Sequence, residues 1–387
     1  MRVTILHNYY QQAGGEDQVF ANESNLLENY GHEVYRYTVH NDRIQNMNSL
    51  SLAKTTLWNS QIYRELRTLF RQESTEIAHF HNTFPLISPA AYYAAKDQGV
   101  AVVQTLHNYR LLCPNAAFFR DNNICEECLG KTVTWPGIVH ACYRNNRAAT
   151  AVITATLSFH RALATWKKMV DVYIALTEFA KLKFISGGLP ADKIIVKPNF
   201  VNPDPGEGNQ SGQYALFVGR LTPEKGISTL IGAWEKLQGK IPLKIAGDGP
   251  LSHIVAQAAQ KIPQVEWLGR IPLPQVYALM KEATFLVFPS EWYEGLPCTI
   301  IEAFATGTPV IAANIGAAQS LVEPDRTGWL YTPGNPADLA AKVTYALAHQ
   351  AKLTQMHQVA RNEFETKYTA EQNYQKIIEI YKIALSK

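Results

Sequence analysis

Residues 285–313 read FLVFPSEWYEGLPCTIIEAFATGTPVIAA and contain three elements in succession. Phe285–Phe288 and Pro309–Ala312 are short apolar runs that indicate buried strands. Between them, Cys298–Thr306 has the length and apolar character of a buried helix, and Pro297 suits the first turn of that helix. A strand, a helix and a second strand in this order predict one unit of a parallel sheet.

The same alternation of strands and helices continues through the chain. Further strand-like runs occur at Val3–Leu6, Ile77–His81, Val100–Thr105, Tyr173–Ala175, Ile194–Val196, Tyr214–Val218, Leu243–Ala246 and Val265–Leu268. Helical patterns such as Glu16–Tyr30 and Ile227–Leu237 lie between them. We therefore predict an α/β fold with parallel sheets that carry helices on both faces.

The length of 387 residues exceeds what one ordinary core holds and predicts two domains. A boundary is expected at 199–213, NFVNPDPGEGNQSGQ, which is rich in Pro, Gly, Asn and Ser. We predict an N-terminal domain at 1–198 and a C-terminal domain at 199–370. The tail, 371–387, is an amphipathic helix expected to pack back on the first domain. Ligands bind beyond the carboxyl ends of parallel strands, so an active site is expected in a cleft between the two domains.

The composition, 47% hydrophobic and 18% charged residues, is typical of a soluble globular protein. No apolar stretch approaches the ~20 residues needed to span a bilayer, and the first residues read as a strand, so we expect a cytoplasmic protein. The net charge is +3, but residues 144–197 carry nine basic and three acidic side chains. That segment fits either a solvated basic face or a surface for anionic lipid or a phosphorylated substrate.

A candidate phosphate site lies in LFVGRLTPEKGISTLIGAW, residues 216–234, which reads as strand, turn and helix. Arg220 and Lys225 flank the start of that helix, and Gly219 and Gly226 permit a tight backbone. A helix N-terminus with neighbouring cations binds phosphate well. Basic residues at such a turn are also often structural.

Two other glycine-rich turns follow predicted strands. LKIAGDGPL, residues 243–251, contains Gly247, Asp248 and Gly249, and LHNYYQQAGGEDQVF, residues 6–20, contains Gly14 and Gly15. Glycines at these points let the backbone approach a ligand, or they simply make the turn.

Two acids surround the apolar helix of the opening stretch. Glu294 lies on the loop before the helix, and Glu302 lies within it beside apolar neighbours, where a carboxylate is costly unless it is hydrogen-bonded. Two acids that accept hydrogen bonds from hydroxyl groups fit a polyhydroxylated ligand, such as a sugar and a ribose. Alternatively, Glu302 bonds a neighbouring backbone group and Glu294 caps the helix.

Two histidines end strands of the first half. His107 follows the run at 100–105, and His81 ends the run at 77–81, so both are expected at the carboxyl edge of one sheet. A lone histidine is more often a packed, hydrogen-bonded residue than a catalytic one.

Four of the five cysteines fall within 113–142, CPNAAFFRDNNICEECLGKTVTWPGIVHAC. Cys113, Cys125, Cys128 and Cys142 have the spacing C-x11-C-x2-C-x13-C, which suits tetrahedral zinc, whereas a reducing compartment disfavours disulfides. We predict a structural zinc site in this insertion, without a catalytic role because four thiolates leave no open coordination position. Loose thiols or an accidental cluster are the alternative, and the fifth cysteine, Cys298, is expected only to pack.

Three motifs in series now identify a family. The order GR-L-x-x-E-K-G (219–226), G-D-G-P-L (247–251) and E-G-L-P-x-x-x-x-E-A-F-A-x-G-x-P-V-I-A (294–312) resembles the retaining GT-B glycosyltransferases of family 4, the glycosyl transferases group 1. The resemblance covers nearly the whole chain. It implies two Rossmann-like domains and transfer of a sugar from a UDP- or GDP-type donor to a hydroxyl acceptor. It further implies retained anomeric configuration and no metal cofactor for catalysis.

The resemblance also implies roles for individual residues. Arg220 and Lys225 would hold the donor diphosphate, and the loop with Gly14 and Gly15 would approach the phosphates or the acceptor. His107, as a catalytic group, would donate a hydrogen bond near the donor sugar, and Glu294 would face the hydroxyls of that sugar. The remaining donor contacts would come from Glu302 at the ribose and from Gly295, Leu296, Pro297, Cys298, Thr299, Gly247, Asp248 and Gly249.

One segment departs from the family pattern. Members often have Glu in the loop that leads to the Thr-Gly pair near 327–328, where this chain has Gln319 or Ser320. The donor contact of that loop, and with it the identity of the sugar, therefore does not follow from the resemblance.

Two other functions share some of these features. A GT-B sugar-nucleotide epimerase would have the same fold, and a non-enzymatic binding module would use the cysteine cluster and the basic segment. The motif series favours a transferase. The cysteine cluster is not accompanied by an array of aromatic and basic residues, so we expect no nucleic-acid partner. The common setting of the family is polysaccharide or glycolipid synthesis, which implies a sugar or lipid-linked acceptor and contact with the inner membrane face.

Overall fold

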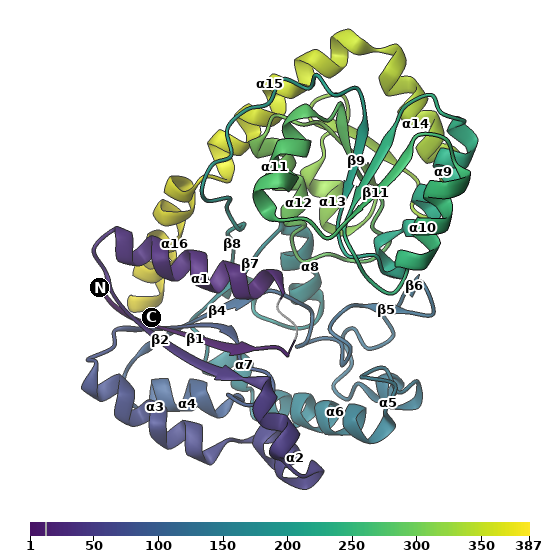
Figure 1. The fold of residues 1–387 in the computed structure, drawn as a ribbon. Coiled ribbons are helices and arrows are strands. Elements are labelled where there is room, and N and C mark those ends of the chain that lie inside the picture. The colour runs from purple at the N-terminus through teal and green to yellow at the C-terminus, as the bar shows by residue number, and fades with distance from the viewer. Residues whose placement is uncertain (12–13) are drawn as a thin grey trace. The chain divides into compact units, whose positions relative to one another are not determined.

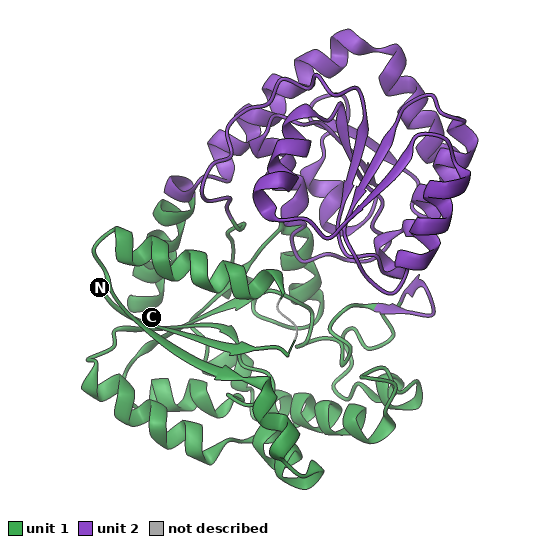
Figure 2. Cartoon of the chain, in the orientation of Figure 1, with its two compact units in different colours: residues 1–118, 125–199, 373–387 green, residues 119–124, 200–372 purple. Residues whose placement is uncertain are grey.

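The computed structural model describes residues 1–11 and 14–387. It divides into two compact units (Figure 2). Unit 1 comprises Met1–Phe118, Cys125–Asn199 and Asn373–Lys387, and unit 2 comprises Phe119–Ile124 and Phe200–Gln372. Each unit has its own parallel sheet, so the predicted α/β class is confirmed.

Unit 1 contains a six-stranded sheet in the order β2-β1-β3-β4-β7-β8, in which all neighbours are parallel. The strands are β1 (Arg2–Tyr9), β2 (Glu33–His40), β3 (Ile77–Asn82), β4 (Ala101–Leu106), β7 (Val172–Ala175) and β8 (Ile194–Val196). Strand β2 was not predicted. It forms an edge of the sheet, and Val39 is its one fully buried residue, so its polar sequence does not read as a buried strand.

Helices cover both faces of this sheet (Figure 1). They are α1 (Gly15–Asn29), α2 (Ser49–Leu57), α3 (Ser60–Gln72), α4 (Ala90–Lys96), α6 (Arg147–Ala162), α7 (Thr165–Lys168), α8 (Glu178–Ser186) and α16 (Ala370–Leu385). Apolar residues of α1 and α16, such as Phe20 and Ile380, share one core cluster with the strands. The tail of the chain thus closes one face of the sheet.

The cysteine-rich segment connects β4 to α6 with little regular structure. It contains the two-stranded hairpin of β5 (Phe119–Arg120) and β6 (Asn123–Ile124) and the short helix α5 (Trp135–Val139). The hairpin is grouped with unit 2, whereas the four cysteines belong to unit 1.

Unit 2 contains the parallel order β11-β10-β9-β12-β13-β14. The strands are β9 (Ala215–Val218), β10 (Leu243–Ala246), β11 (Val265–Gly269), β12 (Phe285–Phe288), β13 (Val310–Ala313) and β14 (Gly328–Tyr331). Numbered within the unit this order is 3-2-1-4-5-6, that of the Rossmann fold. The edge strand β14 was not predicted.

The helices of unit 2 also lie on both faces of its sheet (Figure 1). They are α9 (Ile227–Leu237), α10 (Ser252–Lys261), α11 (Leu273–Glu282), α12 (Cys298–Ala305), α13 (Gly316–Leu321), α14 (Pro336–Ala348) and α15 (Gln350–Lys367). A continuous core joins α9, α10, α14 and α15 to the strands, with Trp234 and Leu339 fully buried in it.

The predicted boundary segment, 199–213, is not a free linker. The N–H of Gly208 donates to the carbonyl of Thr306 at 3.0 Å, and the N–H of Gln210 donates to the carbonyl of Lys281 at 2.9 Å. These bonds attach the segment to unit 2. Across residues 1–11 and 14–387, no helix has both the length and the apolar character that crossing a bilayer requires.

The packing of α16 on unit 1 is open to a direct test. We expect Ile380→Ala to lower the free energy of unfolding of unit 1 by about 2–5 kcal/mol, because Ile380 is fully buried among strands and the cavity would not be refilled. Lys382→Ala, at an exposed position of the same helix, serves as the control. Hydrogen exchange of peptides from β1 and β3 against urea concentration measures the difference. Equal effects of the two substitutions would contradict the packing of α16 on this core.

Candidate active site

The order of strands in unit 2 brings two of the predicted motifs to one place. Strands β9 and β12 are neighbours at the point where the strand order reverses. Arg220 lies just beyond the carboxyl end of β9, and residues 290–297 follow β12. In open α/β sheets, ligands bind beyond the carboxyl ends of strands at this switch point.

The loops beyond these strands pack backbone against backbone. Gly226 has φ of +68°, and a Cβ atom there would lie 1.9 Å from the carbonyl oxygen of Pro289. A Cβ atom on Gly247, where φ is +152°, would lie 1.8 Å from the carbonyl oxygen of Gly219. Side chains at either position are therefore excluded, and the loops after β9, β10 and β12 hold one another in place.

The predicted phosphate-binding lysine is bonded to the predicted sugar-binding acid. Lys225 Nζ donates to Glu294 Oε1 at 2.5 Å, and Ser290 Oγ donates to the same oxygen at 2.8 Å. The exposed fractions of the two charged side chains are 22% and 12%, so solvent screens the pair only partly. Trp292 lies next to this pair, with its ring centroid 5.6 Å from Lys225 Nζ.

Arg220 has a different environment. Its side chain is exposed and has no hydrogen bond or ion pair to the residues that the structure describes. A cation at the switch point that takes no part in holding the fold is available to a ligand.

Glu302 lies in α12, where burial raises the pKa of its carboxyl group to about 7. Its side chain forms no hydrogen bond within the described part of the chain, so the alternative of a bond to neighbouring backbone is not observed. The pKa of Tyr277 is raised by burial and, to a smaller extent, by Glu302, which places the two side chains near each other. A half-buried acid without a partner fits a group that accepts hydrogen bonds from a ligand.

The other predicted donor contacts differ in exposure. Leu296 and Pro297 are buried, whereas Gly295, Cys298 and Thr299 are half-buried around the start of α12. Contacts from this segment to a ligand would therefore come mainly from the backbone.

The turn after β10 is held by its own acid. Asp248 Oδ1 accepts hydrogen bonds from the N–H of Gly249 at 2.8 Å and from Ser252 Oγ at 2.5 Å. These bonds lower the pKa of the Asp248 carboxyl group. Asp248 thus closes the turn before α10, and a Cβ atom on Gly249 would lie only 2.6 Å from the carbonyl oxygen of Leu221.

In unit 1, the two predicted histidines meet at the carboxyl edge of the sheet. His81 Nδ1 lies 2.9 Å from His107 Nε2, and the two rings are stacked. Burial, and next the electrostatic influence of His81, holds the pKa of His107 well below its usual range. His107 as a whole residue is nevertheless partly exposed.

The glycine pair predicted near the donor phosphates lies at the start of α1. Gly14 is the N-cap residue, and its N–H donates to Asp17 Oδ2 at 2.8 Å. Asp17 Oδ1 in turn lies 2.7 Å from His7 Nε2. A Cβ atom on Gly14 or Gly15 would meet no atom within 4 Å, so packing does not demand glycine at either position. Both positions leave space for a ligand.

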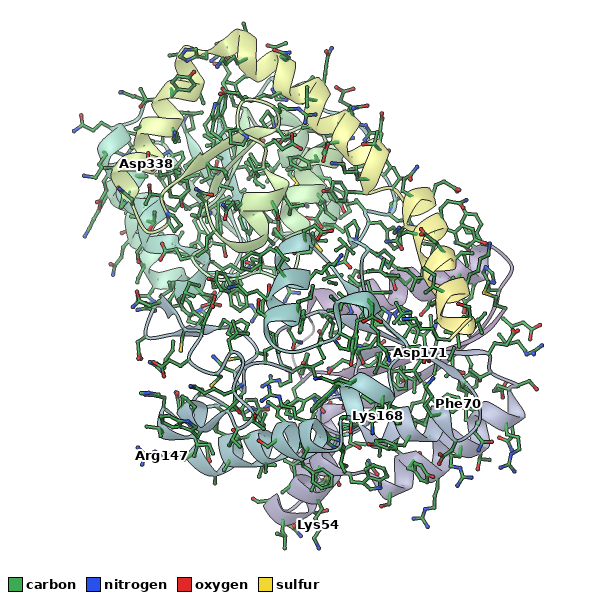
Figure 3. All side chains as sticks on the ribbon, turned by 180° about the vertical axis from the view of Figure 1, so that it is seen from behind. Lys54, Phe70, Arg147, Lys168, Asp171 and Asp338 are labelled. Atoms are coloured by element: carbon green, nitrogen blue, oxygen red, sulfur yellow. The ribbon has the colours of Figure 1, made fainter. Side chains whose placement is uncertain are left out.

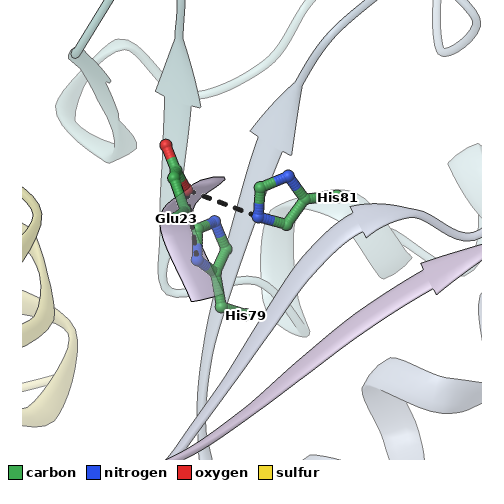
Figure 4. A group of neighbouring side chains, drawn as sticks. All are labelled: Glu23, His79 and His81. Carbon is green, nitrogen blue, oxygen red and sulfur yellow. Dashed lines mark ion pairs between the residues drawn. The ribbon is translucent and has the colours of Figure 1, made fainter. Parts of the chain in front are cut away.

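Sequence reasoning missed several charged and polar residues at these sites. Burial raises the pKa of Glu16 to about 8, and Asn108 Nδ2 donates to Glu16 Oε2 at 3.5 Å beside His107. Glu23 is fully buried next to His79 and His81 (Figure 4). The buried indole N–H of Trp292 has no partner among the described residues. In the sequence, Glu16 and Glu23 look like ordinary acids of an amphipathic helix, so no local signal marks them.

The basic segment 144–197 is not one surface. Arg147 and Lys168 are exposed (Figure 3). Lys197 is fully buried, and Lys183 Nζ bonds Glu126 Oε1 at 2.5 Å. The sequence count therefore overstates the charge that this segment presents to a partner.

The four clustered cysteines share one neighbourhood in unit 1, and none of them forms a disulfide. Cys128 Sγ lies 3.9 Å from the carbonyl oxygen of Thr134, and the N–H of Cys142 donates to the carbonyl of Gly137 in the next turn. Burial raises the pKa of Cys128 to about 11, with further contributions from Cys113, Cys142 and Cys125. The residues fit a thiolate metal site by type and neighbourhood. The sulfur atoms of the cysteines do not, however, form a set that is close enough to hold a metal ion in the described residues. Glu23, His79 and His81 do form such a set, with potential ligand atoms all within 4.8 Å of one another.

Comparison with known proteins places the chain in a family. Residues 3–205 match the family model described as Glycosyltransferase Family 4, and residues 203–363 match the one described as Glycosyl transferases group 1. An uncharacterized glycosyltransferase of Methanocaldococcus jannaschii is 29% identical over 192 residues, which are 49% of this chain and 54% of that protein. A phosphatidyl-myo-inositol mannosyltransferase of Mycobacterium leprae is 28% identical over 197 residues, 48% of this chain and 52% of that protein. The chain thus spans about half the length of the curated relatives it matches.

A solved structure matches over nearly the full length. HepE of Anabaena in complex with UDP has a TM-score of 0.70 at 17% identity, covering 98% of this chain and 99% of that one. Another crystal structure of the same protein contains UDP-glucose. The likeness confirms the predicted GT-B fold with two Rossmann-like domains.

The raised pKa of Glu302 predicts a pH-dependent stability. A carboxyl group with a folded-state pKa of about 7 stabilises the fold fully below its unfolded pKa of ~4.3, and this stability is lost as the pH rises through 7. We therefore expect Glu302→Gln to raise the free energy of unfolding of unit 2 by roughly 1–3 kcal/mol at pH 8 and by much less at pH 5.

Chemical denaturation at the two pH values measures this difference. Glu235→Gln, at an exposed position of α9, is the matched control and should change stability little at either pH. A stabilisation by Glu302→Gln that is the same at pH 5 and pH 8 would refute the assignment of a raised pKa to Glu302.

Proposed function

The chain belongs to glycosyltransferase family 4, and we propose that it transfers a sugar from a UDP- or GDP-type nucleotide sugar to a hydroxyl group of an acceptor. The observation that carries this proposal is the set of charges at the switch point of unit 2. Arg220, Lys225 and Glu294 lie on the loops after β9 and β12, and Glu302 lies in the helix that follows. Cations for a diphosphate and acids for hydroxyl groups are what a nucleotide sugar requires.

The proposed donor site uses each of these groups differently. Arg220 and Lys225 bind the diphosphate together with backbone N–H groups near the start of α12. Glu302 accepts hydrogen bonds from the ribose hydroxyls, which supply the partner that its carboxylate lacks. Glu294 accepts from hydroxyls of the transferred sugar, and its bond to Lys225 connects the sugar site to the phosphate site.

The proposed reaction is a substitution at the anomeric carbon with retained configuration. Its transition state resembles an oxocarbenium ion, while negative charge gathers on the leaving diphosphate. Arg220 and Lys225 stabilise that charge electrostatically, which makes a divalent metal ion unnecessary. For unit 1 we propose His107 as the group that bonds the transferred sugar, on the strength of the family resemblance and its position after β4.

We propose the class of acceptor from the name of one relative. One relative is named as a phosphatidyl-myo-inositol mannosyltransferase, which acts on a lipid. A role in polysaccharide or glycolipid synthesis, with a sugar or lipid-linked acceptor at the inner membrane face, is consistent with that relative. Conversion of the donor without any acceptor would instead favour the epimerase.

A nucleotide panel tests the donor site. We expect UDP, GDP or one of their sugars to raise the unfolding temperature of the protein, because a ligand at 100 times its Kd stabilises the folded state by about 2.7 kcal/mol. Arg220→Ala should abolish this shift and lower turnover by roughly 100-fold or more, while changing stability by less than about 0.5 kcal/mol, because the side chain is exposed and bonds no described residue.

Arg220→Lys is the matched control for the nucleotide panel. It retains the charge but not the two-pronged geometry, so intermediate affinity is expected. Absence of a shift with every nucleotide, or loss of stability and turnover together in Arg220→Ala, would count against the phosphate site.

We further infer that Cys113, Cys125, Cys128 and Cys142 bind a structural zinc ion. Residues 107–146 contain only a short hairpin and a five-residue helix, so the segment has little regular structure to hold it in place. Four thiolates with this spacing suit zinc, and the four lie in one neighbourhood. Binding requires the sulfur atoms to approach one another more closely than they do in this structure.

Metal analysis tests this inference on protein purified without chelator. We expect about one zinc ion per chain in the wild type, because four thiolates complete a tetrahedral site. The double substitution Cys125→Ser and Cys128→Ser should lose the metal, whereas Cys298→Ser, outside the cluster, should retain it. Wild-type protein without stoichiometric zinc would refute the site.

A further inference from the structure

A line of buried polar side chains runs through unit 1 to His107. Lys197, which follows β8, donates to Glu23 Oε1 on α1. The other carboxylate oxygen of Glu23 lies 3.4 Å from His81 Nε2 on β3, and His81 Nδ1 lies 2.9 Å from His107 Nε2. Figure 4 shows Glu23 beside the rings of His79 and His81. Lys197, Glu23 and His81 are buried, and only His107 reaches the surface of unit 1.

Glu23, His79 and His81 bring potential metal ligands within 4.8 Å of one another, but their partners argue against a metal ion. The Lys197 ammonium group already neutralises Glu23, and a divalent cation would face this fixed positive charge. Both ring nitrogens of His79 have partners, Tyr381 Oη at 2.9 Å and Thr105 Oγ1 at 2.8 Å. Lys197 and Glu23 therefore form a buried, hydrogen-bonded ion pair, and His81 contacts its carboxylate.

The charge of Glu23 decides where His81 carries its proton. Burial alone would raise the pKa of Glu23, but the Lys197 ammonium and then His81 hold it well below its usual range, so the group is a carboxylate. The contact of 3.4 Å is long for a hydrogen bond, and neither atom has another partner in the described residues. A carboxylate facing a ring nitrogen in a buried site favours a proton on that nitrogen. With a single ring proton, His81 carries it at Nε2, and its Nδ1 is then a hydrogen-bond acceptor.

This arrangement sets the tautomer of His107. Because His81 Nδ1 accepts, His107 Nε2 must carry the proton and donate across the 2.9 Å contact. The second ring nitrogen of His107, Nδ1, then carries a lone pair. That atom has no hydrogen-bond partner in the described residues, and His107 is partly exposed.

We propose that Glu23 and His81 are positioning residues that fix the ring and tautomer of His107, so that His107 Nδ1 accepts a hydrogen bond from a hydroxyl group of the transferred sugar. The ligand in this statement rests on the proposed function. The proposal reverses the role that the family resemblance implies, in which His107 donates. Its structural part, the tautomer, holds for the free protein and needs no substrate.

The tautomer is measured directly by NMR. In wild-type protein labelled with ¹⁵N-histidine, a long-range ¹H–¹⁵N correlation spectrum at pH 8 distinguishes a protonated from an unprotonated ring nitrogen. We expect His107 to be protonated at Nε2 only, with its signals assigned by their absence in His107→Gln. A proton on Nδ1, or a charged ring, would overturn the proposal, and this outcome does not depend on whether the protein transfers sugar.

Two substitutions of His81 test its positioning role. The side-chain oxygen of Asn lies close to where His places Nδ1, so His81→Asn retains an acceptor for His107, whereas His81→Leu does not. We expect His81→Leu to lower kcat roughly 10–100-fold with little change in KM for the nucleotide sugar, and His81→Asn to recover much of this loss. In a His107→Ala background, His81→Leu should have no further effect on kcat.

The outcomes of these experiments separate the two proposals. Equal losses in His81→Asn and His81→Leu, or an undiminished loss in the His107→Ala background, would show that His81 does not act through His107. If His81→Leu fails to fold, the wild-type NMR spectrum still tests the tautomer of His107, and kcat of His81→Asn still tests the positioning role of His81. If wild type binds no nucleotide sugar at all, the proposed function fails while the tautomer remains measurable.

Discussion

The ion pair between Lys197 and Glu23 is the interaction on which much of unit 1 depends. Both side chains are fully buried, so loss of either partner would leave an uncompensated charge that costs about 3–5 kcal/mol. Lys197 Nζ also donates to Asn373 Oδ1 at 3.2 Å, and Asn373 Nδ2 donates to the carbonyl of Pro198. The pair thus joins α1, the end of β8 and α16 at one point beneath the histidines, so the fold and the candidate site of unit 1 share this interaction.

Unit 2 relies on a different constraint, the close approach of backbone at its switch point. Gly226 and Gly247 allow three loops to pack without side chains between them. The packing holds Arg220, Lys225 and Glu294 on loops beyond the strand ends, and these loops are fixed against one another by their backbones. Rigid support of this kind is what a site for a charged ligand needs, because electrostatic stabilisation depends on groups that are already in place.

Three groups at the candidate sites, Glu302, Glu16 and Arg220, do not serve stability. Glu302 is held where burial raises its pKa to about 7, and Glu16 where burial raises its pKa to about 8. Arg220 is left without a partner among the described residues. Residues that disfavour the fold or contribute nothing to it, and that gather where ligands bind in this architecture, are the pattern expected of functional groups.

The sequence by itself determined the α/β class, most strands of both sheets and the motifs of unit 2, because burial along a strand and turns between elements leave local patterns. It did not reveal the edge strand β2, whose exposed residues resemble loop sequence, or β14, a run of only four residues that is mostly buried. Only the tertiary structure paired Glu23 with Lys197, which are 174 positions apart, and His81 with His107. Neither pair has a local signature, because the order of strands in the sheet decides which distant side chains meet.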